Sequence, residues 1–245
     1  MEDLSVKYDG TVRNSNNTII QFTYGDNGIN TIKQSDHVLK TLEMGNKELA
    51  DKIKFTTQEL KNFKGFNKLN DEFYNNVLRL RNKLRKSRMK TNINNITFES
   101  NFMLPVNIKN IINNIKESEI KGDKLEPEYV INKLEDVLNY ENTKVLSLNE
   151  KMAKDPNSLK YKDEELSKTV FRYALYEFMS PKACIIEYGL TKAKFDKICQ
   201  LVIEKFNRAV VEPGEMVGVL AAQSIGEPKM LWVQKHSIAN YTFIV

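Results

Sequence analysis

The chain has 245 residues, with 37 Lys and Arg against 32 Asp and Glu, and its formal net charge is +5 at pH 7. A content of 41% hydrophobic and 28% charged residues, without a long apolar run, is typical of a globular protein and excludes a membrane span, a collagen and a disordered chain. Two cysteines, Cys184 and Cys199, cannot form a disulfide framework or a four-ligand zinc site, and they favour a reducing compartment.

The first predicted element is a small β-hairpin within residues 6–28. The turn formers Asp9-Gly10 and Asn14–Asn17 separate short stretches of chain, and Thr18–Tyr24 is rich in β-branched and aromatic residues. We therefore expect a β-rich N-terminal segment over residues 1–35.

Two helices are expected next. From Asp36 to about Phe63 apolar residues recur every three or four positions, which predicts helix, with an interruption at Gly45. Asn70 or Asp71 is predicted to cap a second helix. Its apolar stripe would be Phe73, Val77, Leu80 and Leu84.

The middle of the chain is less regular. Residues 87–102 are polar and are expected to be irregular. Pro105 is predicted to open a helix, because proline is tolerated in the first helical turn, and Pro127 is predicted to open another. Their apolar faces would be Ile108, Ile111, Ile112 and Ile115 in the first, and Val130, Leu134, Val137 and Leu138 in the second.

The last third has the clearest helical pattern. Helices are predicted over residues 164–179, 181–188 and 192–209, with Gly189 in the left-handed conformation between the last two and Thr191 as N-cap. Pro213 is predicted to open one more helix that reaches about Gly226. The expected fold class is mainly α with a small N-terminal β hairpin (α+β).

A basic run is the first candidate site. The residues Arg79, Arg81, Lys83, Arg85, Lys86, Arg88 and Lys90 have no acid between them. On a helix, Arg81, Arg85 and Arg88 share one face and are candidate nucleic-acid contacts together with Arg79. The alternative is a solvated helix face, which the absence of interleaved aromatic residues favours. A self-standing basic nucleic-acid-binding protein is the corresponding alternative function.

Two further motifs are weaker. Ala222–Gly226 is similar to a nucleophile elbow around Ser224, but no Asp follows it and the one later histidine is His236. The turn at Gly189 between two predicted helices is compatible with a helix-turn-helix. The spacing of histidines and cysteines does not indicate a metal site, and no cofactor is expected in this chain.

A long motif near the end of the chain identifies a family. Val211-Glu-Pro-Gly-Glu-Met-Val-Gly-Val-Leu-Ala-Ala-Gln-Ser-Ile-Gly-Glu-Pro228 resembles a signature of the largest subunit of multisubunit DNA-directed RNA polymerases. Four further blocks follow the order of that family, and the resemblance covers nearly the whole chain. The blocks Lys7–Ser15 and Ile19–Gly28 resemble the segment just after the bridge helix of that subunit. The blocks Leu104–Ile112 and Glu187–Asp196 resemble the eukaryotic polymerase II type, in the region called the foot.

The resemblance implies a division of the chain. Residues 36–210 would form a helical domain like the foot of that subunit, a platform for other subunits. Residues 211–228 would be the base helix of the mobile trigger loop, and residues 229–245 diverge from the family, so we hypothesise that they are not native polymerase sequence. The residues assigned to this base are Glu215, Gln223, Ser224, Gly226 and Glu227, as packing or hydrogen-bonding groups.

The resemblance also implies what this chain lacks. The family performs nucleotidyl transfer with Mg²⁺ held by an Asn-Ala-Asp-Phe-Asp-Gly-Asp cluster, and this sequence has no such cluster. No catalytic residue is therefore assigned, and the isolated chain is expected to be inactive. The expected partners are other RNA polymerase subunits and, through the complete complex, DNA template and RNA, with no membrane. The bias toward Asn, Lys and Ile suits a large DNA virus or a protist, which places the protein in the nucleus, a cytoplasmic viral factory or a virion.

Overall fold

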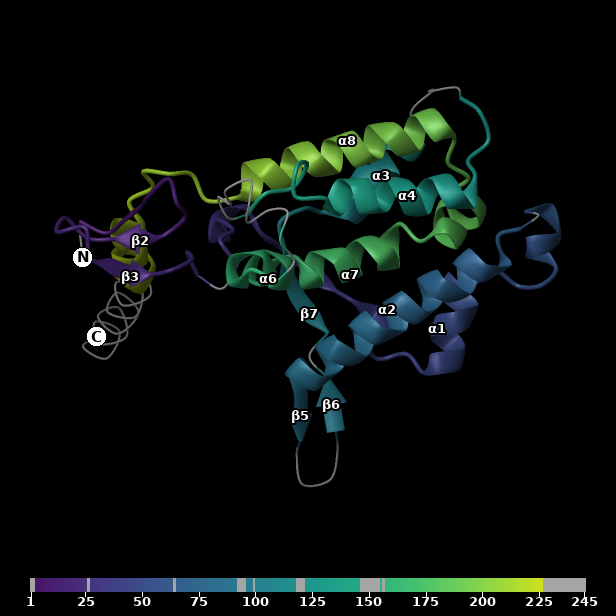
Figure 1. Cartoon of the computed structure of the whole chain (residues 1–245), viewed down its shortest axis with the longest axis horizontal. Helices are drawn as coiled ribbons and strands as arrows, with labels where there is room; N and C mark the ends of the chain where they lie inside the picture. Colours follow the sequence, from purple (N-terminus) through teal and green to yellow (C-terminus); the bar gives the residue numbers. More distant parts are fainter. Residues whose placement is uncertain are drawn as a thin grey trace, which may run out of the picture. The chain divides into compact units, whose positions relative to one another are not determined.

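The computed structural model describes residues 3–25, 27–63, 65–91, 96–98, 100–117, 122–145, 155 and 157–226. Its contacts divide the chain into two compact units (Figure 1). The first consists of Met1–Gly28 and Val211–Val245, and the second of Ile29–Val210. In the described part of the chain, no helix has the length and apolarity needed to cross a bilayer.

A three-stranded antiparallel sheet forms the first part of unit one. Its strands are β1 (Ser5–Val6), β2 (Val12–Arg13) and β3 (Ile19–Gln21), in the order β1-β2-β3. The turn formers act as predicted: Gly10 and Asn17 adopt left-handed φ values of 78° and 62°, which tight turns require. The predicted hairpin is therefore present, and the structure adds a third strand.

The two ends of the described chain meet in unit one. The Val6 N–H donates to the Glu215 carbonyl at 3.0 Å, and the Val6 carbonyl accepts from the Gly214 N–H at 2.7 Å. The Leu4 carbonyl accepts from the Gly218 N–H at 3.3 Å. A small core of Val6, Val12, Val211 and Val217 accompanies these bonds. Segments about two hundred residues apart in sequence thus form one unit.

The predicted start of the last helix at Pro213 is wrong. The helix occupies residues 217–226, and Pro213 and Gly214 lie in a turn before it. Gly214 has φ of 91°, a left-handed value that a right-handed helix cannot contain. This turn presents the Gly214 N–H and the Glu215 carbonyl to Val6, so a tertiary contact determines where the helix begins.

Gly214→Ala is expected to weaken unit one by about 1–2 kcal/mol, because an L-residue with a side chain is strained at this φ. A Cβ at Gly214 would have no atom within 4 Å, so the cost comes from the backbone alone. Amide hydrogen exchange at Val6 and Gly218 measures it. Gly226→Ala is the control. A Cβ at Gly226 would also have no atom within 4 Å, but Gly226 lies in a helix, so no loss of stability is expected. Equal protection in both variants would contradict the role given to Gly214.

Unit two is built mainly from helices. They are α1 (Asn46–Ile53), α2 (Asn67–Arg88), α3 (Ile108–Lys116), α4 (Pro127–Leu138), α6 (Leu159–Ser167), α7 (Thr169–Phe178) and α8 (Lys192–Ala209). Short 3-10 turns are η1 (Thr31–Lys33), η2 (Lys40–Leu42) and η3 (Glu59–Asn62), and η4 (Ala183–Glu187) is a π-helical turn. Helix α7 packs against α2 and α3, with α6 at its N-terminal end, while α8 packs on α3 and α4 (Figure 1).

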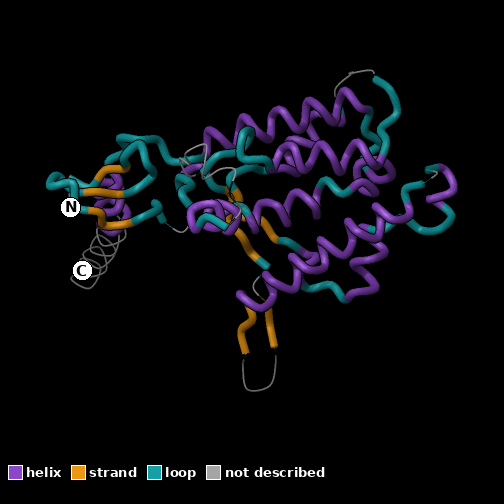
Figure 2. The backbone as a smooth tube through the Cα atoms, viewed as in Figure 1, coloured by secondary structure: helices purple, strands orange, loops and turns teal. Residues whose placement is uncertain are grey.

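Two antiparallel strand pairs complete unit two (Figure 2). Strand β4 (Ser35–Val38) pairs with β7 (Asn101–Leu104), and β5 (Met89–Thr91) pairs with β6 (Ile96–Phe98). The predictions of helix from Asp36 and of irregular chain over residues 87–102 are therefore wrong at these strands. Pairing of β4 with β7 joins residues more than sixty positions apart, so a local sequence period cannot reveal it.

The start of α2 also differs from the prediction. The helix begins at Asn67, and Asn70 lies inside it with 3% of its surface exposed. The Asn70 side chain accepts from the Phe55 N–H at 3.3 Å and donates to the Phe55 carbonyl at 3.5 Å. Asn70 therefore binds the backbone of Phe55, just after α1, and does not cap its own helix.

The helical faces predicted for α3 and α4 are confirmed, because all eight apolar residues named for them are buried. Helix α3, however, begins at Ile108 after Pro105, and Asn107 is its N-cap, whose side chain accepts from the Asn110 N–H at 3.0 Å. The helix predicted over residues 164–179 is two helices, α6 and α7, on either side of Lys168.

Helix α8 matches its predicted range, and Gly189 before it has the expected left-handed φ of 59°. Thr191 occupies the N-cap position, but its side chain makes no capping bond, and within the described chain its buried hydroxyl has no hydrogen-bond partner. The predicted capping by Thr191 is therefore wrong.

Candidate functional site

The residues assigned to the trigger-loop base lie in unit one. Glu215 contacts β1 through its backbone carbonyl, whereas Gln223, Ser224 and Gly226 are exposed on the helix at residues 217–226. Glu227 lies outside the described residues. The structure thus brings Glu215 to the N-terminal sheet and leaves the other described base residues on an open helix surface.

Ser224 shows local hydrogen bonding. Its hydroxyl donates to the Leu220 carbonyl one turn earlier, at 2.9 Å. This bond is common for serine within a helix and needs no catalytic explanation. His236, the other half of the weak hydrolase alternative, lies outside the described residues. The geometry around Ser224 therefore gives a hydrolase no support.

Arg81, the second residue of the basic run, is inside the fold. Its side chain is 1% exposed; Nη1 donates to the Met44 carbonyl at 3.1 Å, and Nη2 donates to Asn46 Oδ1. Burial, followed by the charge of Arg85, lowers the pKa of Arg81. Its guanidinium is directed at the turn before α1 and not at solvent.

Arg85 joins Arg81 at the same turn. Its Nε donates to the Leu42 carbonyl at 2.6 Å and its Nη2 to the Met44 carbonyl at 2.7 Å. Arg79 is exposed and bonds Asn76 at 3.2 Å, while the side chain of Arg88 lies outside the described part. The structure therefore separates Arg79, which faces solvent, from Arg81 and Arg85, which hold the chain between η2 and α1.

A second cluster of polar side chains surrounds Glu177 of α7. The Thr41 hydroxyl donates to Glu177 Oε2 at 2.6 Å and lies 2.6 Å from the Tyr173 hydroxyl. Because Thr41 has one hydroxyl hydrogen, Tyr173 must donate to Thr41. Lys52 Nζ lies 3.2 Å from Glu177 Oε1, and burial raises the pKa of Tyr173. These bonds join η2 and α1 to α7.

A buried ion pair lies where α6 meets α7. Lys168 Nζ is 2.8 Å from Glu164 Oε1, and both side chains are 1% exposed. Lys168 also donates to the Thr143 carbonyl, and Glu164 Oε1 accepts from the Val145 N–H at 3.0 Å. The sequence signal was an acid and a base four residues apart, a spacing that places them on one helix face, but their burial was not predictable from it.

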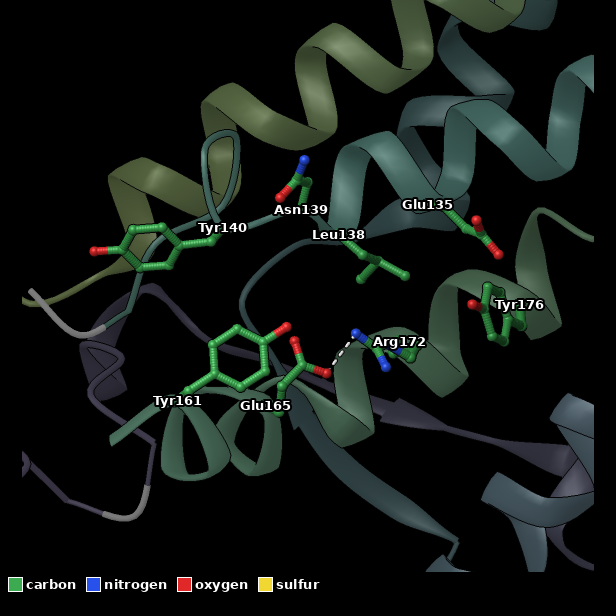
Figure 3. A pocket seen from close by; sticks show the side chains of 8 residues that line it. All are labelled: Glu135, Leu138, Asn139, Tyr140, Tyr161, Glu165, Arg172 and Tyr176. Carbon is green, nitrogen blue, oxygen red and sulfur yellow. Dashed lines mark ion pairs between the residues drawn. The ribbon is translucent and has the colours of Figure 1, made fainter. Parts of the chain in front are cut away.

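The second unit also contains a cavity of about 340 Å³ between α4, α6 and α7 (Figure 3). Its lining is Glu135, Leu138, Asn139, Tyr140, Tyr161, Glu165, Arg172 and Tyr176. Figure 3 shows the ion pair between Arg172 Nη2 and Glu165 Oε2, at 2.7 Å, at one wall. Burial raises the pKa of Tyr176, Arg172 acts in the opposite direction, and Glu135 and Glu165 add to the increase. No sequence motif links these residues, and sequence reasoning missed the cavity.

Over the part of the chain that the structure describes, no three side chains of the types His, Cys, Asp or Glu gather as a metal site requires. The two cysteines are buried free thiols, and burial chiefly raises the pKa of Cys199 to about 12.

Comparison with known proteins matches the chain to one family. The family model described as RNA polymerase Rpb1, domain 5, matches residues 1–231. The chain is 32% identical over 238 residues to DNA-directed RNA polymerase subunit 1 of Acanthamoeba polyphaga mimivirus. It is 27% identical over 261 residues to DNA-directed RNA polymerase II subunit RPB1-B of Trypanosoma brucei brucei.

Each alignment covers 93% of this chain but little of the relative, 16% of the mimivirus subunit and 14% of the trypanosome one. The chain therefore corresponds to one domain-sized segment of a much longer subunit. The resemblance inferred from the motif at residues 211–228 is confirmed. The chain belongs to the RNA polymerase Rpb1 domain 5 family and is a segment of the largest-subunit type.

Proposed function

We propose that the chain serves DNA-templated transcription as a structural and subunit-contacting platform of a DNA-directed RNA polymerase. The observation that carries this proposal is the family match over residues 1–231. It is supported by the use of the buried charges, because Arg81, Glu164 and Lys168 bond to the chain itself and hold its helices together. The alternative, a self-standing nucleic-acid-binding protein, is not favoured, since Arg81 and Arg85 donate to backbone carbonyls.

In this proposal unit one is the root of the trigger loop. Val6 accepts from Gly214 and donates to Glu215 directly before the helix at residues 217–226. These bonds fix the start of that helix to the N-terminal sheet, so a mobile segment that follows would move from a firm base. Glu215 acts through its backbone in this role, and Gln223, Ser224, Gly226 and Glu227 are the exposed or following positions that would meet other polymerase elements.

The complete enzyme supplies the remaining chemistry. Mg²⁺ would be held by the acidic cluster of another segment, and the partners are the other polymerase subunits, with DNA template and RNA bound by the assembled complex. The match to viral and eukaryotic subunits supports a location in the nucleus, a viral factory or a virion.

The test uses the tagged 245-residue chain, expressed alone or with the other polymerase subunits encoded by the same genome. We expect the chain to co-purify with those subunits, and we expect no primer extension from the chain alone with Mg²⁺ and all four nucleotides, because it lacks the acidic cluster. Extension by the purified chain would contradict the proposed division of labour. Loss of co-purification would contradict the platform role.

A further inference from the structure

The cavity between α4, α6 and α7 has an acidic and aromatic lining. Its size, about 340 Å³, lies at the small end of ligand pockets, which span roughly 300–1,000 Å³, and suits a side chain better than a cofactor. Three tyrosines and the largely buried Leu138 contribute to the wall (Figure 3). The Tyr176 ring packs edge-to-face against the Phe73 ring, and the two ring centroids lie 5.2 Å apart.

Among the described residues, the charges of the lining leave the Glu135 carboxylate without an ion-pair partner. Arg172 is paired with Glu165 at 2.7 Å, and the members of this pair are 29% and 30% exposed. Glu135, on the opposite wall, has no hydrogen bond or ion pair with any other described residue. The ionisable lining therefore carries two carboxylates against one guanidinium. A cation can pair with Glu135 without displacing the ion pair between Arg172 and Glu165.

The tyrosine rings of the lining favour one type of cation, a guanidinium. Tyrosine faces attract cations, and the Tyr140 ring already has Lys144 Nζ at 5.5 Å and Lys168 Nζ at 5.8 Å from its centroid. A guanidinium is planar, stacks on aromatic rings, is weakly hydrated, and can bind a carboxylate through two parallel hydrogen bonds. An arginine side chain therefore matches both the rings and Glu135.

We infer that this cavity receives an arginine side chain of a partner protein, with its guanidinium paired to Glu135. The inference rests on the proposed function as a contact platform, and it names the chemistry of one contact. The aligned segment makes up 16% and 14% of the matched relatives, which are named as polymerase subunits, so protein surfaces are the natural neighbours of this domain.

The probe is N-acetyl-argininamide, titrated into the 245-residue chain while the side-chain NMR signals of Tyr161 and Tyr176 are followed. We expect saturable shifts at both tyrosines. Glu135→Gln is expected to weaken binding about tenfold, because it removes the unpaired charge and keeps the shape. N-acetyl-citrullinamide, which is neutral and of the same shape, should not bind, and N-acetyl-lysinamide should bind less tightly than the arginine probe.

Asp136→Asn is the matched control. It removes the same charge one position along α4, where Asp136 interacts with Tyr129 and Cys199 and does not line the cavity. Affinity for the arginine probe should be unchanged in this variant. Absence of saturable shifts, equal weakening by the two variants, or equal binding of the citrulline probe would overturn the inference. The proposed function would fail separately, through loss of co-purification with polymerase subunits.

Discussion

Lys168→Met is expected to lower the free energy of unfolding by about 3–5 kcal/mol, the cost of leaving a buried charge without its partner. The variant removes the ammonium group 2.8 Å from Glu164 Oε1 while both side chains are 1% exposed. It also leaves the Thr143 carbonyl without its donor. Urea unfolding of the 245-residue chain, followed by circular dichroism, measures the loss.

The control for this prediction is Lys160→Met, which changes an exposed lysine of α6 and is expected to alter stability by less than about 0.5 kcal/mol. The double variant Glu164→Leu/Lys168→Met should recover much of the stability, because the uncompensated carboxylate is then absent. A Lys168→Met protein as stable as the Lys160→Met protein would show that the pair contributes little.

Arg81→Met is expected to destabilise the chain by about 2–4 kcal/mol, since it keeps most of the side-chain stem but removes buried hydrogen bonds made by a charged donor. The Met44 carbonyl and the Asn46 side chain lose a partner, and both belong to the chain entering α1. The same unfolding measurement detects the effect. We expect the change to weaken the contact between α2 and the segment from η2 to α1.

Arg79→Met separates this structural role from nucleic-acid binding. Arg79 is exposed on the same helix, so its replacement should change stability by less than about 0.5 kcal/mol. The affinity of both variants for single-stranded RNA is measured by filter binding at increasing salt concentration. Tight, salt-sensitive binding that is lost in Arg79→Met and in a folded Arg81→Met protein would favour the nucleic-acid-binding alternative.

Several elements were predictable because their information is local. The apolar faces of α3 and α4 follow from apolar residues at helical spacing, and α8 has a clear period with Gly189 before it. The β turns at Gly10 and Asn17 follow from residues that tolerate positive φ. Family membership was also available from sequence, because the motif at residues 211–228 is long and specific.

Other elements depend on contacts between distant residues. Ser35–Val38 is a strand because β7 supplies its hydrogen bonds, although the apolar spacing after Asp36 indicated helix. Asn70 is a typical helix cap by type, yet it bonds Phe55 from inside α2. Pro213 lies in a turn instead of opening a helix, because Val6 bonds to the backbone of Gly214 and Glu215 directly after it.

The sequence by itself determined the family, the helical character of the chain and which faces of its clearest helices are buried, since these depend on residue type and short-range spacing. The tertiary structure alone decided how the charged residues are used. It placed Arg81 and Lys168 inside the fold, left Arg79 in solvent, and assembled an acidic, aromatic cavity from three helices. Burial and charge pairing depend on which distant segments meet, and neither composition nor periodicity records that.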